Sequence, residues 1–347
     1  MKRLLVLVPL VAACGLTDPG RPDEGPRRAW NLVAGPDPGS WHGAKLTWDP
    51  VRHGIVMYTG RNVNAPTDST KVYLWKNRTW TEICTKGTPP TAPRYLPGFV
   101  WNPKTQDLVL AGGSYDGPAF TNLATNVYTC NESDEWTLAG SLKEGRAGAD
   151  LVFNPDRNEM MLIGGRAVAA QLHTIETSTD AAVWQTSSIQ LPFDCAGAGQ
   201  NVTWDSNSHR ILALAGELSA NRDDAQVFHD EVWSLYSTET SWDQVCKNCS
   251  GTPRTDASIV HLGLDNDDTD ENYVINGYIG HDQQIAGTWI LDHNDLLDVI
   301  RNEPAKRDGV GVAYDADAQS LITHGGTGQS CPDFECSETL ELESLGP

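Results

Sequence analysis

Three arginines occur in the same local context along the chain, and their side chains could act together on an anion. Arg94, Arg146 and Arg307 each stand seven residues before an aromatic residue that is followed by Asp or Asn. A guanidinium presents a planar fork of N–H donors that matches a carboxylate or a sulfate. If the fold brings the three side chains to one channel, they form a site for an acidic ligand. The alternative is structural, with each guanidinium bonded to backbone carbonyls and acidic residues.

Two further residues belong to this candidate ligand site. Trp41 holds the arginine position in the first copy of the pattern, where its indole could stack on a sugar ring or pack in the core. Arg254 stands ten residues before Leu264, which places it near the arginine position but out of register.

A dense acidic turn, DNDDTDE, spans residues 265–271. Asp265, Asp267 and Asp270 offer the oxygen ligands that suit Ca²⁺, so Ca²⁺ is the one cofactor that the sequence suggests. The turn lacks the glycine and the terminal glutamate of an EF-hand loop. An exposed and solvated acidic turn is the alternative interpretation.

Known catalytic signatures are absent from the sequence. It contains no Gly-x-Ser-x-Gly, no phosphate-binding loop and no His-Glu-x-x-His. His324, which precedes Gly325-Gly326, is the histidine that could face the channel; the alternative is a structural role, which is the commoner one for a lone histidine. Because no acid–base pair can be named, a binding role is favoured over an enzymatic one.

The elements that must position these residues follow from an internal repeat. An aromatic or apolar residue, an Asp or Asn, an apolar run and a glycine recur six times, beginning at Trp48, Trp101, Phe153, Trp204, Leu264 and Tyr314. The terminal glycines are 53, 52, 51, 61 and 49 residues apart. A period near 50 residues is typical of propeller blades.

Each copy predicts a four-stranded blade. The Asp or Asn starts a turn by bonding the backbone two residues on, and the glycines stand where a side chain would collide with the next blade. Later strands carry a tryptophan in four copies, at Trp80, Trp136, Trp184 and Trp242, and Leu297 replaces it in the fifth. The sixth copy lacks its last strand, which residues 28–34 are expected to supply, because Arg28–Val33 resembles Arg78–Ile83. That pairing closes the ring.

The twin glycines, the aromatic–Asp/Asn pair and the following tryptophan resemble the kelch repeat. The resemblance covers residues 28–347 and implies an all-β, six-bladed kelch-type β-propeller of the galactose oxidase and kelch-like superfamily. Members bind through loops at the channel mouth, and some exported ones act on sugars. The copper ligands of the oxidase type cannot be matched here, so that chemistry is not expected.

The N-terminus resembles a bacterial lipoprotein signal peptide. Lys2 and Arg3 precede a short apolar stretch that ends at Ala12-Ala13-Cys14-Gly15. The resemblance implies cleavage after residue 13 and lipid, such as palmitate, on Cys14; an ordinary secretory signal is the alternative. Residues 14–27 are expected to form a flexible tether. Because Gly15 is not the aspartate of inner-membrane retention, the outer membrane is favoured, facing either the periplasm or the surface.

Cysteine content and charge agree with export. Seven further cysteines predict disulfides in an oxidising compartment. Cys246 and Cys249, and Cys331 and Cys336, are close enough to pair locally, but the connectivity cannot be deduced, and a zinc site is a weaker alternative. The net charge of −21 argues against nucleic acid as a partner.

Together these features predict a monomeric envelope lipoprotein, anchored by Cys14, that binds a glycan or a protein. The alternative function is a carbohydrate-active enzyme, similar to an acidic-sugar isomerase, that holds its substrate with the three arginines. A role in envelope assembly, with loops as docking surfaces, is a third hypothesis.

Overall fold

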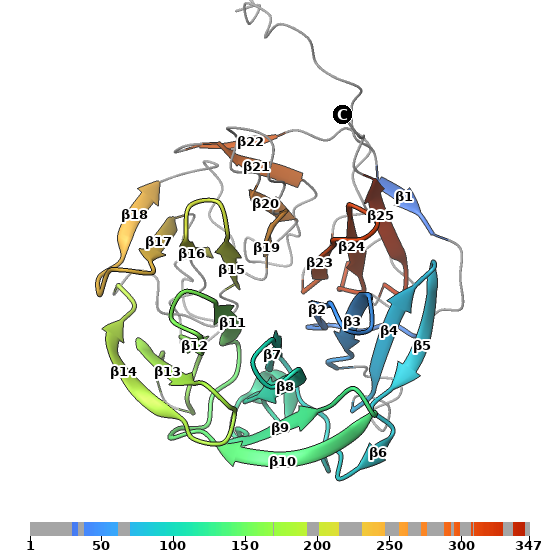
Figure 1. The fold of residues 1–347 in the computed structure, drawn as a ribbon, viewed down its shortest axis with the longest axis horizontal. Helices are drawn as coiled ribbons and strands as arrows, with labels where there is room; N and C mark the ends of the chain where they lie inside the picture. Colours follow the sequence, from blue (N-terminus) through green and yellow to red (C-terminus); the bar gives the residue numbers. More distant parts are fainter. Residues whose placement is uncertain are drawn as a thin grey trace, which may run out of the picture.

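The computed structural model describes residues 30–33, 38–61, 70–168, 170–192, 201–214, 231–246, 257–262, 272–275, 288–292, 295–298, 307, 309–328 and 336–343. These residues form an all-β, propeller-like fold in which antiparallel sheets surround a common centre (Figure 1). The described part contains one short 3-10 helix, η2 (Gly117–Ala119), between strands. No helix within it is long and apolar enough to cross a membrane.

Five sheets are blades built from consecutive strands. Blade one contains β2 (Lys45–Asp49), β3 (Gly54–Tyr58), β4 (Val72–Lys76) and β5 (Thr79–Ile83). Blade two contains β7 (Gly98–Asn102), β8 (Asp107–Ala111), β9 (Asn126–Cys130) and β10 (Glu135–Ser141), with β6 (Lys86–Gly87) added in parallel on its outer edge. Blade three contains β11 (Asp150–Asn154), β12 (Glu159–Ile163), β13 (Thr174–Ser178) and β14 (Gln185–Gln190).

The next two blades repeat this order. Blade four contains β15 (Asn201–Asp205), β16 (Arg210–Leu214), β17 (Val232–Tyr236) and β18 (Asp243–Cys246). Blade five contains β19 (Ser258–His261), β20 (Asn272–Ile275), β21 (Thr288–Asp292) and β22 (Asp295–Asp298). The structure therefore has five blades made from one continuous segment each, one fewer than the six that the repeat predicts.

The remaining sheet joins the two ends of the chain, and we call it the two-ended sheet. It contains β23 (Gly311–Asp315), β24 (Ser320–His324), β25 (Thr339–Glu343) and β1 (Trp30–Leu32). β1 pairs antiparallel with β25, with Trp30 opposite Leu342. Residues 30–32 thus take the outer position that the resemblance of residues 28–33 to residues 78–83 predicts.

The innermost hairpins begin with the predicted side-chain turns. Asp49 Oδ1 accepts hydrogen bonds from the backbone N–H groups of Val51 and Arg52, both at 2.9 Å. The same pattern recurs at Asn102, Asn154, Asp205 and Asp315. Because the side-chain oxygen accepts the backbone N–H groups of the turn, the Asp or Asn determines where each hairpin reverses direction.

The twin glycines are required by both conformation and space. Gly112 and Gly113 adopt φ values of 67° and 96°, in the left-handed region. A Cβ on Gly112 would lie 2.7 Å from the carbonyl oxygen of Arg146 in blade three, and a Cβ on Gly325 would lie 2.3 Å from that of Trp41. The predicted collision with the next blade is confirmed at these positions.

Blade five corrects one alignment made from the sequence. His261 pairs with Asn272, in the ladder position where Trp48 pairs with Ile55. His261, and not Leu264, therefore occupies the aromatic position, and the connection to β20 is four residues longer than in the other blades. Measured from His261, Arg254 stands seven residues upstream, in register with the other arginines.

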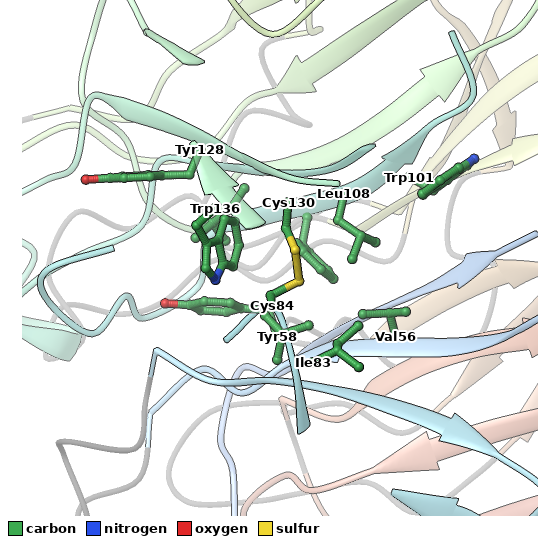
Figure 2. Packing of buried hydrophobic residues seen from close by; sticks show 12 residues of the cluster. Val56, Tyr58, Ile83, Cys84, Trp101, Leu108, Tyr128, Cys130 and Trp136 are labelled. Atoms are coloured by element: carbon green, nitrogen blue, oxygen red, sulfur yellow. A yellow bond between two sulfur atoms is a disulfide. The ribbon is translucent and has the colours of Figure 1, made fainter. Parts of the chain in front are cut away.

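The core lies between adjacent blades, and a disulfide crosses one of these interfaces. Figure 2 shows Tyr58 and Ile83 of blade one packed near Tyr128 and Trp136 of blade two, around the Cys84–Cys130 bond. The bond links cysteines 46 residues apart. Chain entropy assigns about 4 kcal/mol to closing a loop of this length.

The disulfide pairing was not predicted from the sequence, which suggested only the two local pairs. Cys336 is also disulfide-bonded, to a cysteine whose side chain lies outside the described residues. The pairing of Cys246 with Cys249 lies outside them as well.

The two-ended sheet makes a stability prediction. Trp30 is 8% exposed, packs with Val260 and Leu342, and donates from Nε1 to Thr288 Oγ1 at 3.0 Å. We expect Trp30→Ala to lower the free energy of unfolding by about 3–5 kcal/mol, and deletion of residues 28–34 to lower it further. Leu32→Ala, on the same strand but 66% exposed, is the control and should change it by less than about 0.5 kcal/mol. Equal urea midpoints for the two variants would contradict the role assigned to β1.

Candidate ligand site in the central channel

A cavity of about 430 Å³ lies at the centre of the described fold, and the innermost strands of all six sheets line it. These strands are β2, β7, β11, β15, β19 and β23. The first strand of each repeat therefore lines the channel, as expected. Because equivalent strands of the six sheets surround the cavity, the side chains that these strands carry determine its chemistry.

Polar side chains gather at one position of these strands, the first residue. Lys45, Asp150, Asn201 and Ser258 occupy it in blades one, three, four and five, and we call them the polar end of the channel. Gly98 and Gly311 occupy the same position in the other two sheets.

An ion pair links two blades at the polar end. Lys45 Nζ lies 3.0 Å from Asp150 Oδ1 and 3.5 Å from Asn201 Oδ1. The side chains of Lys45 and Asp150 are 16% and 12% exposed, so the pair is partly dehydrated and still reachable. Two of the three ammonium donors are used by these partners, and the third can meet a ligand oxygen.

The other polar side chains are held by the neighbouring blade. Asp150 Oδ2 accepts the backbone N–H of Val202 at 3.1 Å, and Ser258 Oγ donates to the carbonyl of Val310 at 2.6 Å. Asn201 Nδ2 donates to the carbonyl of Ala257. These bonds fix the side chains before any ligand arrives, which lowers the entropic cost of binding.

Aromatic side chains line the channel at the fourth position of the same strands. Trp48, Trp204 and Tyr314 stand there, with His261 in blade five, and we call these four residues the aromatic end. Apolar side chains such as Leu46, Phe99 and Val152 line the wall as well. The channel thus combines hydrogen-bonding groups at one position of the strands with aromatic side chains at another.

The three predicted arginines are not part of this cavity. Each is 1% exposed, and each donates from Nη1 to the first of the twin glycines of its own sheet. The acceptors are the carbonyls of Gly112, Gly164 and Gly325, at 3.0, 3.1 and 3.2 Å from Arg94, Arg146 and Arg307. The guanidiniums do not appear among the groups that line the channel. Their hydrogen bonds match the structural alternative, in which each guanidinium bonds to backbone carbonyls.

Two of these arginines also pair with acids. Arg146 Nη2 lies 2.7 Å from Glu176 Oε1, with side chains 1% and 0% exposed, and Arg307 Nη2 lies 2.8 Å from Glu338 Oε2. Burial lowers the pKa of Arg146, and the Glu176 carboxylate offsets part of that effect. Arg94 instead lies over the Tyr128 ring, 5.0 Å from its centroid.

Trp41 and His324 are core residues. Trp41 is 1% exposed and donates from Nε1 to the carbonyl of Pro38 at 3.1 Å. His324 is fully buried, with Nδ1 2.9 Å from Thr339 Oγ1 and Nε2 3.0 Å from the carbonyl of Gly39. Neither is among the residues that line the cavity, and for Trp41 this is the core alternative that the sequence analysis left open.

The other candidates lie outside the described residues. They are Arg254 and the Ca²⁺ ligands Asp265, Asp267 and Asp270. Within the part of the chain that is described, no three His, Cys, Asp or Glu side chains are grouped so as to hold a metal ion.

Sequence reasoning missed the polar end, although the repeat contained a signal for it. Lys45, Asp150, Asn201 and Ser258 each stand three residues before the aromatic position. Comparing the six copies at that position would have shown polar residues in four copies and glycine in two. No protein-family model matches the chain, and no curated protein does. Function must therefore be inferred from the channel itself.

The Arg146–Glu176 pair yields a prediction that separates structure from binding. We expect Arg146→Met to lower the free energy of unfolding by about 3–5 kcal/mol, because it leaves a buried carboxylate without its cation. Adding Glu176→Gln should recover part of that loss. Lys71→Met is the control: Lys71 and Glu82 form an ion pair whose side chains are 34% and 42% exposed, so the change should stay below about 1 kcal/mol. Urea unfolding measures the free energy of unfolding of all three variants. An Arg146→Met protein as stable as the unchanged protein would contradict the structural role of the Arg146–Glu176 pair.

Proposed function

We propose that this protein is a lipid-anchored, six-bladed kelch-type β-propeller of a bacterial cell envelope, and that it binds a glycan in its central channel. The observation that carries the binding role is the cavity of about 430 Å³ with a polar end and an aromatic end. Pockets for small ligands span roughly 300–1,000 Å³.

The two-ended sheet is the sixth blade in this proposal. It is hydrogen-bonded to both neighbours. Ser258 Oγ of blade five donates to the carbonyl of Val310, and Gly326 N–H donates to the carbonyl of Trp41 beside blade one at 2.7 Å. Bonds on both sides support a closed ring, which removes open edges between blades. The twin glycines and the Asp/Asn turns support the kelch assignment.

A glycan suits the chemistry of the channel. Sugar hydroxyls both donate and accept, and the polar end offers an ammonium, a carboxylate, an amide and a hydroxyl. The faces of Trp48 and Trp204 suit the apolar face of a sugar ring. A recessed cavity with convergent polar groups favours a small ligand over a docked protein.

The alternative function, an isomerase that grips an acidic sugar with three arginines, has no comparable support. Arg94, Arg146 and Arg307 are buried and bonded to protein carbonyls. We therefore do not propose it.

The anchor is proposed from the N-terminus. Residues 1–13 serve as the signal peptide, Cys14 carries the lipid, and residues 14–27 form the tether of a monomeric domain. The Cys84–Cys130 bond supports export, because disulfides persist in oxidising compartments. The outer membrane is the proposed location.

Glycan binding can be tested on a soluble form that begins at residue 15, with tryptophan fluorescence and calorimetry against neutral and acidic oligosaccharides. We expect Lys45→Met to weaken the binding of the best ligand by about 10-fold to 100-fold, because a charge-assisted hydrogen bond is lost. Lys71→Met is the matched control, since Lys71 pairs with Glu82 at the surface of blade one, at 3.3 Å. The proposal fails if no oligosaccharide binds, or if the two variants weaken binding equally.

The anchor can be tested separately in cells. We expect Cys14→Ser to move the protein from the membrane fraction to the soluble fraction and to abolish incorporation of labelled palmitate. The double variant Cys84→Ser/Cys130→Ser removes two other cysteines and should keep both properties. Membrane retention of Cys14→Ser would rule out the lipid anchor.

A further inference from the structure

Three residues at the junction of blades four and five break the repeat, and they lie together. The residue after the turn-forming Asp or Asn is Pro50, Pro103, Pro155 or Ala316 in the other described hairpins, but Ser206 in blade four. His261 replaces an aromatic residue in blade five. Its ladder partner, Asn272, replaces the apolar residue found in every other sheet, namely Ile55, Leu108, Met160, Ile211 or Leu321.

These three side chains form one hydrogen-bonded series. Ser206 Oγ lies 3.0 Å from His261 Nε2, and His261 Nδ1 lies 3.1 Å from Asn272 Oδ1. Asn272 is fully buried, the His261 side chain is 5% exposed, and Ser206 is exposed. The series therefore runs from the interior of the sheet to a hydroxyl that solvent can reach.

The surroundings determine which imidazole nitrogen carries the proton. Nδ1 faces two oxygens, Asn272 Oδ1 and, at 3.7 Å, Asp205 Oδ1. Asn272 Nδ2 in turn points at Asp205 Oδ2, at 3.5 Å, which orients its amide oxygen toward the ring. A proton on Nδ1 satisfies this arrangement and leaves the Nε2 lone pair to accept the Ser206 hydroxyl.

Asp205 supplies a fixed negative charge behind the ring. Its side chain is fully buried, and Arg210 Nε lies 2.9 Å from Oδ2. Burial raises the pKa of Asp205, but the hydrogen bond from the Ser208 N–H and the neighbouring His261 and Arg210 side chains outweigh that effect and lower it. Asp205 Oδ1 lies 3.7 Å from Nδ1, so the carboxylate stands beside the ring nitrogen that does not face Ser206.

We propose that Ser206 is a nucleophile, with His261 as its general base, in a site that cleaves carboxylic esters. Asn272 and Asp205 are positioning residues. This activity goes beyond glycan binding and does not depend on it. A serine, a base and a group that orients the base make up the arrangement that activates serine in unrelated folds.

The reaction balances with water as the second substrate. Ser206 Oγ attacks the carbonyl carbon while its proton passes to His261 Nε2, and the ester C–O bond breaks as the alcohol leaves with that proton. Water then attacks the acyl group and gives a proton to Nε2. The bond from the acyl carbon to Oγ breaks, Oγ takes the proton back, and the carboxylic acid leaves.

Turnover should be slow, because the adjacent N–H groups are already used. The backbone N–H groups of Asn207 and Ser208 both donate to Asp205 Oδ1, at 3.2 and 3.1 Å. One lost oxyanion donor costs about 10²–10³-fold in rate. Covalent labelling of Ser206 is therefore a better test than ester turnover.

The experiment treats the full chain with a fluorophosphonate probe and locates the adduct by mass spectrometry. We expect the adduct on Ser206, its loss in Ser206→Pro, and a labelling rate at least 100-fold lower in His261→Phe. Both variants restore residue types that the repeat uses, so thermal unfolding should show that they remain folded. Ser208→Ala, in the same turn, is the control and should label normally.

Asn272 is tested by the pH profile of labelling. Asn272→Leu, which restores the apolar residue, should lower the rate, and Asn272→Asp should recover it. The acid limb of the Asn272→Asp profile should move to higher pH, because a carboxylate beside Nδ1 favours the imidazolium. A merely structural residue would leave the profile unmoved.

Three results would overturn the proposal: no adduct on Ser206, an adduct whose rate does not depend on His261, or a pH profile that Asn272→Asp leaves unchanged. Glycan binding by Ser206→Pro is measured in parallel. It should match that of the unaltered protein, so the two functions fail or stand independently.

Discussion

The structure depends on how the edge of each innermost strand is satisfied. Each innermost strand is the inner edge strand of its sheet. The backbone groups on its open side have no partner in the same sheet and must find one elsewhere. Side chains of the preceding blade supply partners. Thr47 Oγ1 accepts the N–H of Trp101 at 3.3 Å, Asp150 accepts that of Val202, and Thr203 Oγ1 accepts that of His261 at 3.1 Å. The same contacts that hold neighbouring blades together therefore place polar atoms around the channel.

This constraint explains why the repeated residues are structural. Arg94, Arg146 and Arg307 recur in the three sheets that carry twin glycines, because each of these sheets has the same glycine carbonyl to satisfy and a buried guanidinium with several donors reaches it. The turn-forming Asp and Asn residues recur for a similar local reason. A residue that recurs because it satisfies the blade itself is a poor guide to what the whole ring binds.

Departures from the repeat are more informative about function. Lys45 and Asp150 occupy the same position, the first residue of the innermost strand, in two different blades. They carry opposite charges and form an ion pair across the channel. Ser206, His261 and Asn272 replace three residues of other chemistry in one small region, and they bond to one another. Chance substitution at three positions would more often leave a buried polar group without a partner, which is costly. Their mutual satisfaction argues that they were selected together.

The sequence alone determined the local features of this protein. The pairing of β1 with β25 follows from the likeness of residues 28–33 to the outer strand of blade one. The order of strands, the Asp/Asn turns and the glycines with positive φ follow from patterns within one blade. Backbone sterics and hydrogen bonds a few residues apart set them, so they can be predicted without the rest of the fold. Only the tertiary structure decided the register of blade five, the Cys84–Cys130 pairing, the burial of the arginines and the makeup of the polar end. Each of these depends on which neighbouring blade a side chain meets, and residues far apart in the sequence determine that contact.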